Sequence, residues 1–202
     1  MRYTWPKFKL CRREWVNLFW PEKYNVKQRR ALPGQHGANF PRLSEYGKLL
    51  RNKQVLKRMY QMSEKQFAKL VTTISKKYAK NKWLDHDKVL IQFLDRRLDN
   101  VIVSSWRATT IFQARQMVTH GHFFVNWKKH NIPSYYVNMN DEIVLRPKLH
   151  SSNLYWADTT AKLPIWLSVN QANFSIKVLD LPSASEKPSV DVLKVIEFYA
   201  RA

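Results

Sequence analysis

Two histidines flank a glycine in the segment ARQMVTHGHFFVN, residues 114–126. The imidazoles of His120 and His122 have the chemistry to ligate a metal ion or to act as a catalytic base. A zinc site needs further ligands, and neither Cys11 nor His130 stands at a familiar spacing from this pair. We therefore expect no metal site at this position.

A catalytic role for the two histidines would require a nucleophile or a paired acid within reach. The nearby acid, Asp99, has a simpler role as an ion-pair partner within its pair of helices. Gly121 is the residue type that closes a helix in the left-handed conformation, and the apolar run after it suits a strand. We interpret the segment as a turn from a helix into a strand and expect neither a catalytic residue nor a cofactor.

The charge of the chain points to a polyanionic partner. The 202 residues carry a net charge of +20, and residues 1–88 hold 22 Lys and Arg against 6 Asp and Glu. Because 45% of the residues are hydrophobic, this is a folded chain rather than a disordered basic tail. Nucleic acid is favoured over an acidic membrane, since neither a basic amphipathic helix with a wide apolar face nor a lipid signal stands out.

Other classes of protein are excluded by composition. One cysteine rules out an internal disulfide and any multi-cysteine zinc site. No apolar run approaches the roughly 20 residues that span a bilayer, and the start lacks the apolar stretch of a secretory signal. Only four glycines are present, and they form no cofactor-binding loop.

The basic half of the chain is predicted to be helical after an irregular start. Three prolines within residues 1–40 favour extended chain with at most one short helix, followed by a tight loop at PGQHG. The segment 44–60 has apolar residues at helical spacing. Ser63 and Gln66 form a capping-box pattern that opens the next helix, which ends near Tyr78.

The second half combines helices and strands. One helix is expected over 87–103 and another after Thr110, which forms a capping box with Gln113. The expected strands are HFFVN, two short strands within SYYVNMNDEIVLRP, residues 165–169 and 174–179, and a final VIEFYA, while WKKH is expected to be a turn. The fold class is therefore α+β.

Basic residues on helices and glycines in a loop make up the expected nucleic-acid contacts. Helical cations can follow phosphates on both sides of a groove, and if the nucleic acid is A-form RNA, its shape is recognised more than its base edges. The glycines of PGQHG would let the backbone approach a phosphate, with two donors beside them. The predicted RNA-binding residues are Arg2, Lys7, Lys9, Arg12, Arg13, Gly34, Gln35, His36, Gly37, Arg42, Lys48, Arg51, Lys53, Lys57, Arg58, Arg97, Thr110, Arg115, Gln116 and His120.

Several motifs resemble one family along nearly the whole chain. LDRRLDNVIV, ARQMVTHGHFFVNWKKHNIPSY and NDEIVLRP are similar to the small RNA-binding module named after small-subunit ribosomal protein S-four. The same module occurs in RNA-modifying enzymes and in a ribosome-rescue RNA chaperone. The flanks RYTWPKFKLCRREWVNLF, PGQHG, RLSEYGKLLRNKQVLKRMY and VIEFYAR resemble the ribosomal family itself, and residues outside the module leave no room for a catalytic domain.

The resemblance implies a structural protein of the small ribosomal subunit that is not an enzyme. Such a protein binds small-subunit rRNA at a multi-helix junction early in assembly, near the channel through which messenger RNA enters, beside protein S-five. It implies a basic helical rRNA-binding domain over 1–88, an inserted module of two helices and a small antiparallel sheet over 89–150, and a segment 151–202 whose strands pack back on the first domain.

Departures from the family pattern concern three places. Cys11 alone cannot form the metal-binding knuckle of some relatives, and Asn126-Trp127 stands where the family's hairpin turn has Asn-Gly. Only Arg42 is charged just after PGQHG, which weakens the case for unwinding messenger RNA.

The aromatic- and lysine-rich character and the ending IEFYAR resemble mitochondrial and alphaproteobacterial relatives. A mitochondrial ribosome is therefore the expected location, with bacterial cytoplasm or a plastid as alternatives. No membrane partner is expected.

Overall fold

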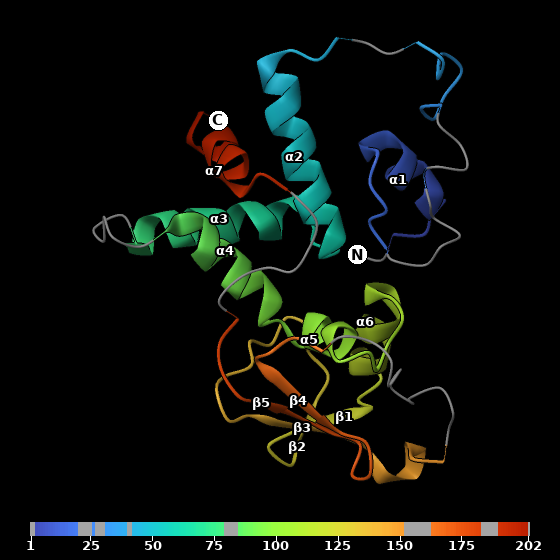
Figure 1. Ribbon diagram of the computed structural model, residues 1–202, viewed down its shortest axis with the longest axis vertical. Coiled ribbons are helices and arrows are strands. Elements are labelled where there is room, and N and C mark those ends of the chain that lie inside the picture. Colours follow the sequence, from blue (N-terminus) through green and yellow to red (C-terminus); the bar gives the residue numbers. More distant parts are fainter. Residues whose placement is uncertain are drawn as a thin grey trace. The chain divides into compact units, whose positions relative to one another are not determined.

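The chain forms two compact units, each with its own core (Figure 1). The computed structural model describes residues 3–19, 26, 31–39, 42–78, 85–151, 163–182 and 190–201. One unit consists of residues 1–87 with 187–202, and the other of residues 88–186. The first is helical and the second adds a five-stranded antiparallel sheet, which confirms the α+β class. Within the described ranges, no helix combines the length and apolar character needed to cross a bilayer.

The first unit is built from helices, two of which begin at serine caps that the sequence marks. In its described part, these are α1 (Lys7–Glu14), α2 (Glu45–Met59), α3 (Glu64–Tyr78) and α7 (Val192–Arg201). The Ser44 hydroxyl accepts a hydrogen bond from the Gly47 amide at 3.2 Å, and Ser63 caps α3 in the same way through the Gln66 amide at 3.3 Å. The two expected helices of this region are thus confirmed, because each cap satisfies an amide that the first helical turn leaves open.

The last element of the chain is a helix and not the expected strand. Val192, Val195 and Phe198 recur at helical spacing, and the Asp191 carboxylate accepts from the Lys194 amide at the start of α7. The ring of Phe198 lies 5.5 Å from that of Tyr46 on α2, so α7 packs beside α2 within this unit (Figure 1). The apolar run VIEFYA was ambiguous between strand and helix, and a helical partner decided it.

The single helix expected over 87–103 is interrupted. It forms α4 (His86–Asp95) and α5 (Leu98–Ser104), with Arg97 in extended conformation between them. The amides of Leu98 and Asp99 donate to the carbonyls of Tyr135 and Pro133 at 2.8 and 3.2 Å. The start of α5 therefore finds its hydrogen-bond acceptors in a distant segment, a contact that helical periodicity cannot reveal.

The sheet of the second unit has the order β2-β1-β3-β5-β4, with all neighbours antiparallel. Its strands are β1 (Phe123–Val125), β2 (Lys128–His130), β3 (Glu142–Leu145), β4 (Leu167–Asn170) and β5 (Ser175–Val178). WKKH thus contains a strand and not only a turn. SYYV forms just an isolated bridge between Tyr136 and Arg97.

Strands β4 and β5 extend this sheet, which differs from the expected division of the chain. β5 pairs with β3 through Ile143 and Ile176, so residues 163–182 complete the second unit and do not pack on the first domain as strands. The helix α6 (Ile111–Thr119) and α5 cover the inner face of the sheet. The shared core includes Ile102, Val118 and Ile143, each fully removed from solvent.

Candidate nucleic-acid interface

Helix α6 divides its residues between the core and an exposed side. The Thr110 hydroxyl accepts from the Gln113 amide at 3.2 Å, which confirms the predicted start of the helix. The Gln113 side chain reaches back to Thr109 instead of Thr110, so the second half of the capping box is shifted by one residue. Thr110 therefore acts as a helix cap, and Gln116 and His120 are left exposed further along the helix.

The helix ends at a glycine whose lack of a side chain makes room for a lysine. Gly121 has φ +68°, as the predicted left-handed closing residue requires, and a Cβ atom there would collide with the aliphatic part of Lys129. The stem of Lys129 lies across this end of α6, where unpaired helix carbonyls favour a positive charge. The turn interpretation of the His-Gly-His segment is confirmed.

Two histidines and an arginine lie near the end of α6. The rings of His120 and His122 lie edge to face with centroids 5.6 Å apart, and the Arg146 amide donates to the His122 carbonyl at 2.9 Å. Burial lowers the pKa of His122, and the neighbouring His120 and Arg146 lower it further. We call this region the α6–hairpin surface: Gln116, Thr119, His120, Trp127, Lys128, Lys129 and Arg146.

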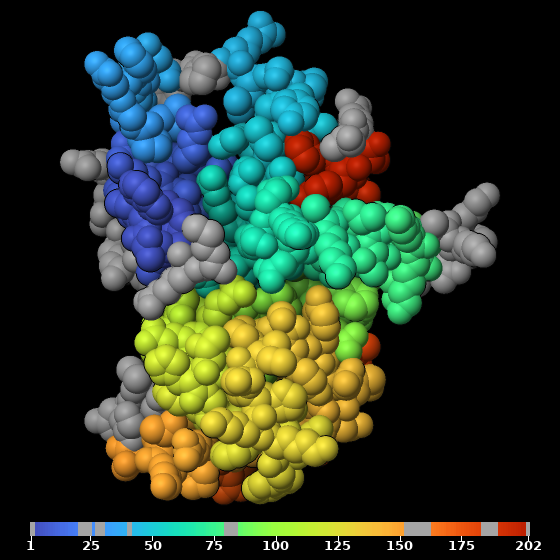
Figure 2. Space-filling model, turned by 180° about the vertical axis from the view of Figure 1, so that it is seen from behind, coloured from blue at the N-terminus to red at the C-terminus, as the bar shows by residue number. Residues whose placement is uncertain are grey.

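The exposed residues of α6 and those of the β1–β2 hairpin belong to the same second unit. In Figure 2 the yellow-green atoms of α6 adjoin the yellow atoms of the hairpin and of the chain that follows it. No salt bridge or hydrogen bond to a carboxylate involves Lys128 or Lys129 within the part of the chain that the structure describes. Both lysines lie outside the predicted RNA-binding residues because WKKH was predicted to be a turn, although their position after Asn126-Trp127 was a hairpin signal.

Arg97 does not belong to this surface, contrary to expectation. Its side chain is 3% exposed and forms two hydrogen bonds to Asp99, at 3.1 and 2.8 Å. Asp99 is itself fully buried, so the two form a bidentate pair inside the second unit. The expected ion-pair role of Asp99 is confirmed, and the expectation that Arg97 faces RNA is wrong.

Arg115 is only partly available. Burial lowers the pKa of the Arg115 guanidinium. The negative charge of Asp99 raises this pKa, and the positive charge of Arg97 lowers it further. Arg115 therefore lies close to the buried pair, at the margin of the exposed side of α6.

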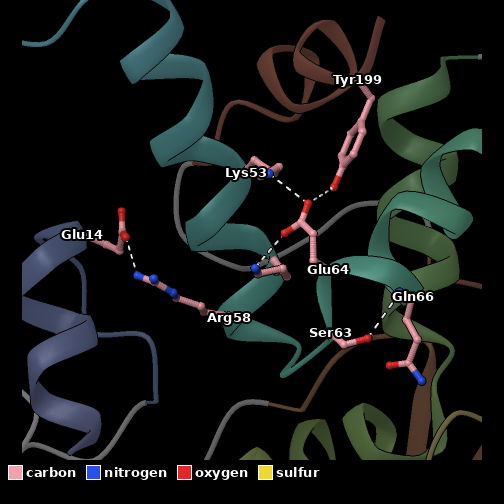
Figure 3. A network of polar contacts seen from close by, with 8 residues as sticks. Glu14, Lys53, Arg58, Ser63, Glu64, Gln66 and Tyr199 are labelled. Carbon is pink, nitrogen blue, oxygen red and sulfur yellow. Dashed lines mark hydrogen bonds and ion pairs between the residues drawn. The ribbon is translucent and has the colours of Figure 1, made fainter. Parts of the chain in front are cut away.

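In the first unit, two arginines of α2 are bound internally by one carboxylate. Arg51 donates to Glu14 on α1 at 3.0 Å. Arg58 donates to the same Glu14 oxygen, a contact drawn in Figure 3. Burial raises the pKa of Glu14, although both guanidiniums oppose the shift. This Glu14 cluster ties α1 to α2 and removes both arginines from the set of freely exposed cations.

Two lysines of α2 are bound in a second cluster, around Glu64. Lys53 and Lys57 donate to its two carboxylate oxygens at 2.8 and 2.7 Å, and the Tyr199 hydroxyl donates at 2.8 Å (Figure 3). Burial alone would raise the pKa of Glu64, but these three hydrogen bonds lower it to about 2. Lys53 is 6% exposed, and its Nζ lies 4.2 Å from the ring centroid of Phe198. Lys53 therefore joins α2, α3 and α7. It is not available to contact RNA, contrary to the prediction.

The loop at PGQHG is as tight as predicted, but its two glycines differ. Gly34 has φ +119° with open space where a Cβ would lie. Gly37 is buried, and a Cβ atom there would collide with the Leu32 carbonyl. The Leu32 amide also donates a hydrogen bond to the Gly37 carbonyl at 3.0 Å. Gly37 thus closes the loop and does not bring backbone to a phosphate, whereas Gln35 and His36 are exposed.

The other predicted cations of the first unit fall into two groups. Arg12 donates to the carbonyls of Ala31 and Leu32 at 2.9 and 3.0 Å and thereby holds the PGQHG loop. The exposed predicted residues are Lys9, Arg13, Arg42 and Lys48, while Lys7 is half-buried and Arg2 lies outside the described residues. Lys48 forms a solvent-exposed pair with Glu45 at 2.6 Å.

Helix α3 carries exposed lysines that were not among the predicted RNA-binding residues. Lys65, Lys69 and Lys76 recur on the side of α3 opposite to the buried Phe67 and Ile74. In the described ranges they have no carboxylate partner. The signal for them was their spacing relative to the apolar stripe. Among the described residues, no three His, Cys, Asp or Glu side chains gather in a way that could hold a metal ion.

Two family models match the chain in succession. The model of the ribosomal protein S4/S9 N-terminal domain matches residues 2–95, and that of the S4 domain matches residues 96–143. The boundary between the two models coincides with the break between α4 and α5.

Individual proteins are similar to the chain over its whole length. Small ribosomal subunit protein uS4 of Thermotoga petrophila is 39% identical over 212 residues, which cover 99% of both chains. Protein uS4B of Clostridium acetobutylicum is 38% identical over 203 residues, covering 99% of this chain and 98% of its own. Protein uS4 of Petrotoga mobilis is 37% identical over 215 residues, covering 99% of each.

Proposed function

Because the chain belongs to the uS4 family, the S-four family of small-subunit ribosomal proteins, we propose that it is a structural constituent of the small ribosomal subunit that binds its rRNA. The family is a structural one and not a family of enzymes, which excludes the RNA-modifying alternative. The observation that carries the proposal is the similarity over 99% of the chain, which covers both the basic helical part and the S4 domain. A free-standing chaperone that shares only the S4 domain would not match the first 95 residues.

Two exposed basic regions are proposed to contact the RNA. In the first unit these are Lys9 and Arg13 on α1, the loop residues Gln35 and His36, Arg42, Lys48 and the lysines of α3. In the second unit it is the α6–hairpin surface. Lysine and arginine side chains on helices and hairpins suit phosphates and 2′-hydroxyls, because the base edges of A-form RNA lie in a deep groove.

Binding is expected to depend strongly on salt. Each phosphate that a lysine or arginine neutralises releases a condensed counterion. Contact with about 6–10 phosphates would lower affinity by about 10³–10⁵ between 50 and 200 mM salt, the range established for duplex DNA. A much weaker dependence would contradict a binding mode dominated by phosphate contacts.

The position within the subunit is proposed from the resemblance to the family. We propose binding at a multi-helix junction of the rRNA, early in assembly, next to protein S-five and near the channel for messenger RNA. Support for a contact with messenger RNA is limited to Arg42 and the exposed donors of the PGQHG loop. Chemical footprinting of the rRNA during stepwise reconstitution tests the early role, since protections must appear before most other proteins are added.

The cellular location is proposed to be the mitochondrial ribosome, with the bacterial cytoplasm as the alternative. The proposal rests on the aromatic- and lysine-rich composition and the ending IEFYAR, whereas the relatives described above are bacterial. Fractionation of source cells, followed by immunoblotting of purified organelles and cytosol, distinguishes the two locations. Absence of the protein from mitochondria would leave the ribosomal proposal intact and overturn only the location.

The decisive experiment is sedimentation of the tagged chain in a lysate at moderate salt, with sequencing of crosslinked RNA from the peak. Co-migration with the small subunit, with crosslinks clustered at one rRNA junction, is the expected result. Migration as free protein, or crosslinks to transfer RNA, would overturn the proposal.

A further inference from the structure

The hairpin between β1 and β2 holds a tryptophan in a backbone conformation that favours glycine. Val125 pairs with Lys128, so Asn126 and Trp127 form a two-residue turn, with φ values of +46° and +64°. Two positive φ values define the type I′ turn, in which glycine is strongly preferred at the second position. A bulky aromatic residue in this conformation is an outlier.

The neighbouring Asn126 has a clear reason for its conformation. Its side-chain amide donates to Asp141 at 2.8 Å, and its side-chain oxygen accepts from the Glu142 amide at 3.0 Å. Asparagine tolerates positive φ better than most residues, and these bonds fix the turn against β3. The strain at Trp127 has no such local explanation.

Packing does not explain Trp127 either. Its side chain is 79% exposed, and it forms no ring contact with any residue that the structure describes. Phe174 offers a contrast in the same unit: it too has a positive φ, +48°, but its ring stacks on His150 with centroids 4.5 Å apart and lies 5.2 Å from the Arg107 guanidinium. These ring contacts compensate the strain at Phe174, whereas no ring contact among the described residues compensates it at Trp127. Uncompensated strain of this kind is typical of binding sites.

The surroundings of Trp127 identify the chemistry of its ligand. Lys128 and Lys129 follow it directly, both are exposed, and His120 and Arg146 belong to the same surface. An exposed indole beside lysines matches the combination that binds unpaired nucleotides, in which a base stacks on the ring while cations hold the phosphates. A protein partner without many acidic residues would be attracted less strongly than RNA by these clustered positive charges.

We propose that Trp127 stacks on an unpaired base of the RNA that the α6–hairpin surface binds. This inference rests on the proposed rRNA-binding function and adds a base contact to it. The base must lie in a loop, bulge or junction, because paired bases of an A-form helix do not expose a face. Stacking is insensitive to base identity, so the contact recognises the absence of pairing and not a sequence.

The proposal makes opposite predictions for stability and binding upon Trp127→Gly. Glycine relieves the positive φ, so the thermal midpoint should rise by about 2–4 °C. Loss of the ring should weaken binding to a transcript of the small-subunit rRNA by about 5- to 150-fold, the range for loss of one stacked base. A residue that is exposed without function would show only the first effect.

Three further variants sharpen the experiment. Trp127→Phe keeps the strain and a smaller ring, so it should retain most of the affinity without the gain in stability. Ile132→Ala removes another exposed apolar side chain, 56% exposed, and should leave affinity unchanged within twofold. Because stacking neutralises no phosphate, Trp127→Gly should not change the slope of log affinity against log salt, whereas a Lys128→Ala, Lys129→Ala double substitution should.

The outcomes separate this inference from the proposed function. If the unaltered protein fails to bind the rRNA transcript, the proposed function fails. If it binds and Trp127→Gly binds equally well, the stacking inference is overturned. Equal binding to the free transcript, combined with loss of the variant from assembled subunits, would assign Trp127 to a neighbouring protein and overturn stacking as well.

Discussion

The lysines and arginines of α2 and those of the β1–β2 hairpin have the same chemistry and opposite roles. On α2, Arg51 and Arg58 bind Glu14, and Lys53 and Lys57 bind Glu64. In the hairpin, neighbouring Lys128 and Lys129 have no carboxylate partner among the described residues. The first set holds helices together, and the second set is available to a polyanion.

The difference shows that position relative to carboxylates, and not local charge density, decides which cations are available. The first unit lies in the more basic half of the chain, yet four predicted RNA-binding residues of its central helix are used internally. The α6–hairpin surface arises in the less basic half. Four predictions test this contrast.

Arg97→Met should have the largest effect, because it breaks the buried pair with Asp99. The Asp99 carboxylate would remain fully buried without its two hydrogen bonds, so the free energy of unfolding should fall by about 3–5 kcal/mol. Urea denaturation of the full chain measures the loss, with Lys148→Met as an exposed control expected to change stability by no more than about 0.5 kcal/mol. Unchanged stability with weakened RNA binding would restore Arg97 as an RNA contact.

Glu14→Gln should have the second largest effect. It leaves two half-buried guanidiniums without their carboxylate, and the expected loss is about 2 kcal/mol, below the usual range for a buried pair because solvent reaches both arginines. Glu45→Gln removes the exposed partner of Lys48 and should cost less than about 0.5 kcal/mol. Chemical denaturation at neutral pH compares the two variants, and equal losses would show that the Glu14 cluster is not structural.

The Lys128→Ala, Lys129→Ala double variant should weaken RNA binding by about tenfold while leaving the thermal midpoint unchanged. Two lost phosphate contacts should make the slope of log affinity against log salt shallower by about 1.5. Filter binding at several salt concentrations measures both quantities, with Lys177→Ala on β5 as a control for one exposed charge. A large drop in stability without a change in slope would contradict the contrast with α2.

The smallest effect concerns acid stability. The pKa of Glu64 is lowered from 4.5 to about 2 in the folded chain, so its contribution to stability is complete above about pH 5 and is lost as the pH falls toward 2. Since its side chain is 46% exposed, we expect about 1 kcal/mol and not the full value of the shift. Urea midpoints at pH 6, 4 and 3 should converge for the native chain and Glu64→Gln, and a constant difference between them would contradict this assignment.

Local signals predicted local structure well. Interactions within a few residues determine the helix caps at Ser63 and Thr110 and the left-handed conformation of Gly121. The helices that begin or end at these residues were therefore predicted from the sequence. The predictions failed where a distant segment decided the outcome. The break before α5 depends on carbonyls of residues 133 and 135, and VIEFYA is helical beside α2.

The availability of residues in the candidate RNA interface likewise depends in part on local sequence and in part on distant contacts. Exposure of Gln116 and His120 followed from the apolar stripe of their own helix. The capture of Lys53 by Glu64 and Tyr199 brings together three elements, and no spacing in the sequence contains it.

The sequence by itself determined the family, the α+β class, most helices and an excess of positive charge, because these depend on composition and on contacts between near neighbours. Only the tertiary structure decided which cations are free, because an ion pair forms where the fold brings a carboxylate within reach. It also placed β4 and β5 in the sheet of the second unit, and it left Trp127 exposed on a backbone that would favour glycine.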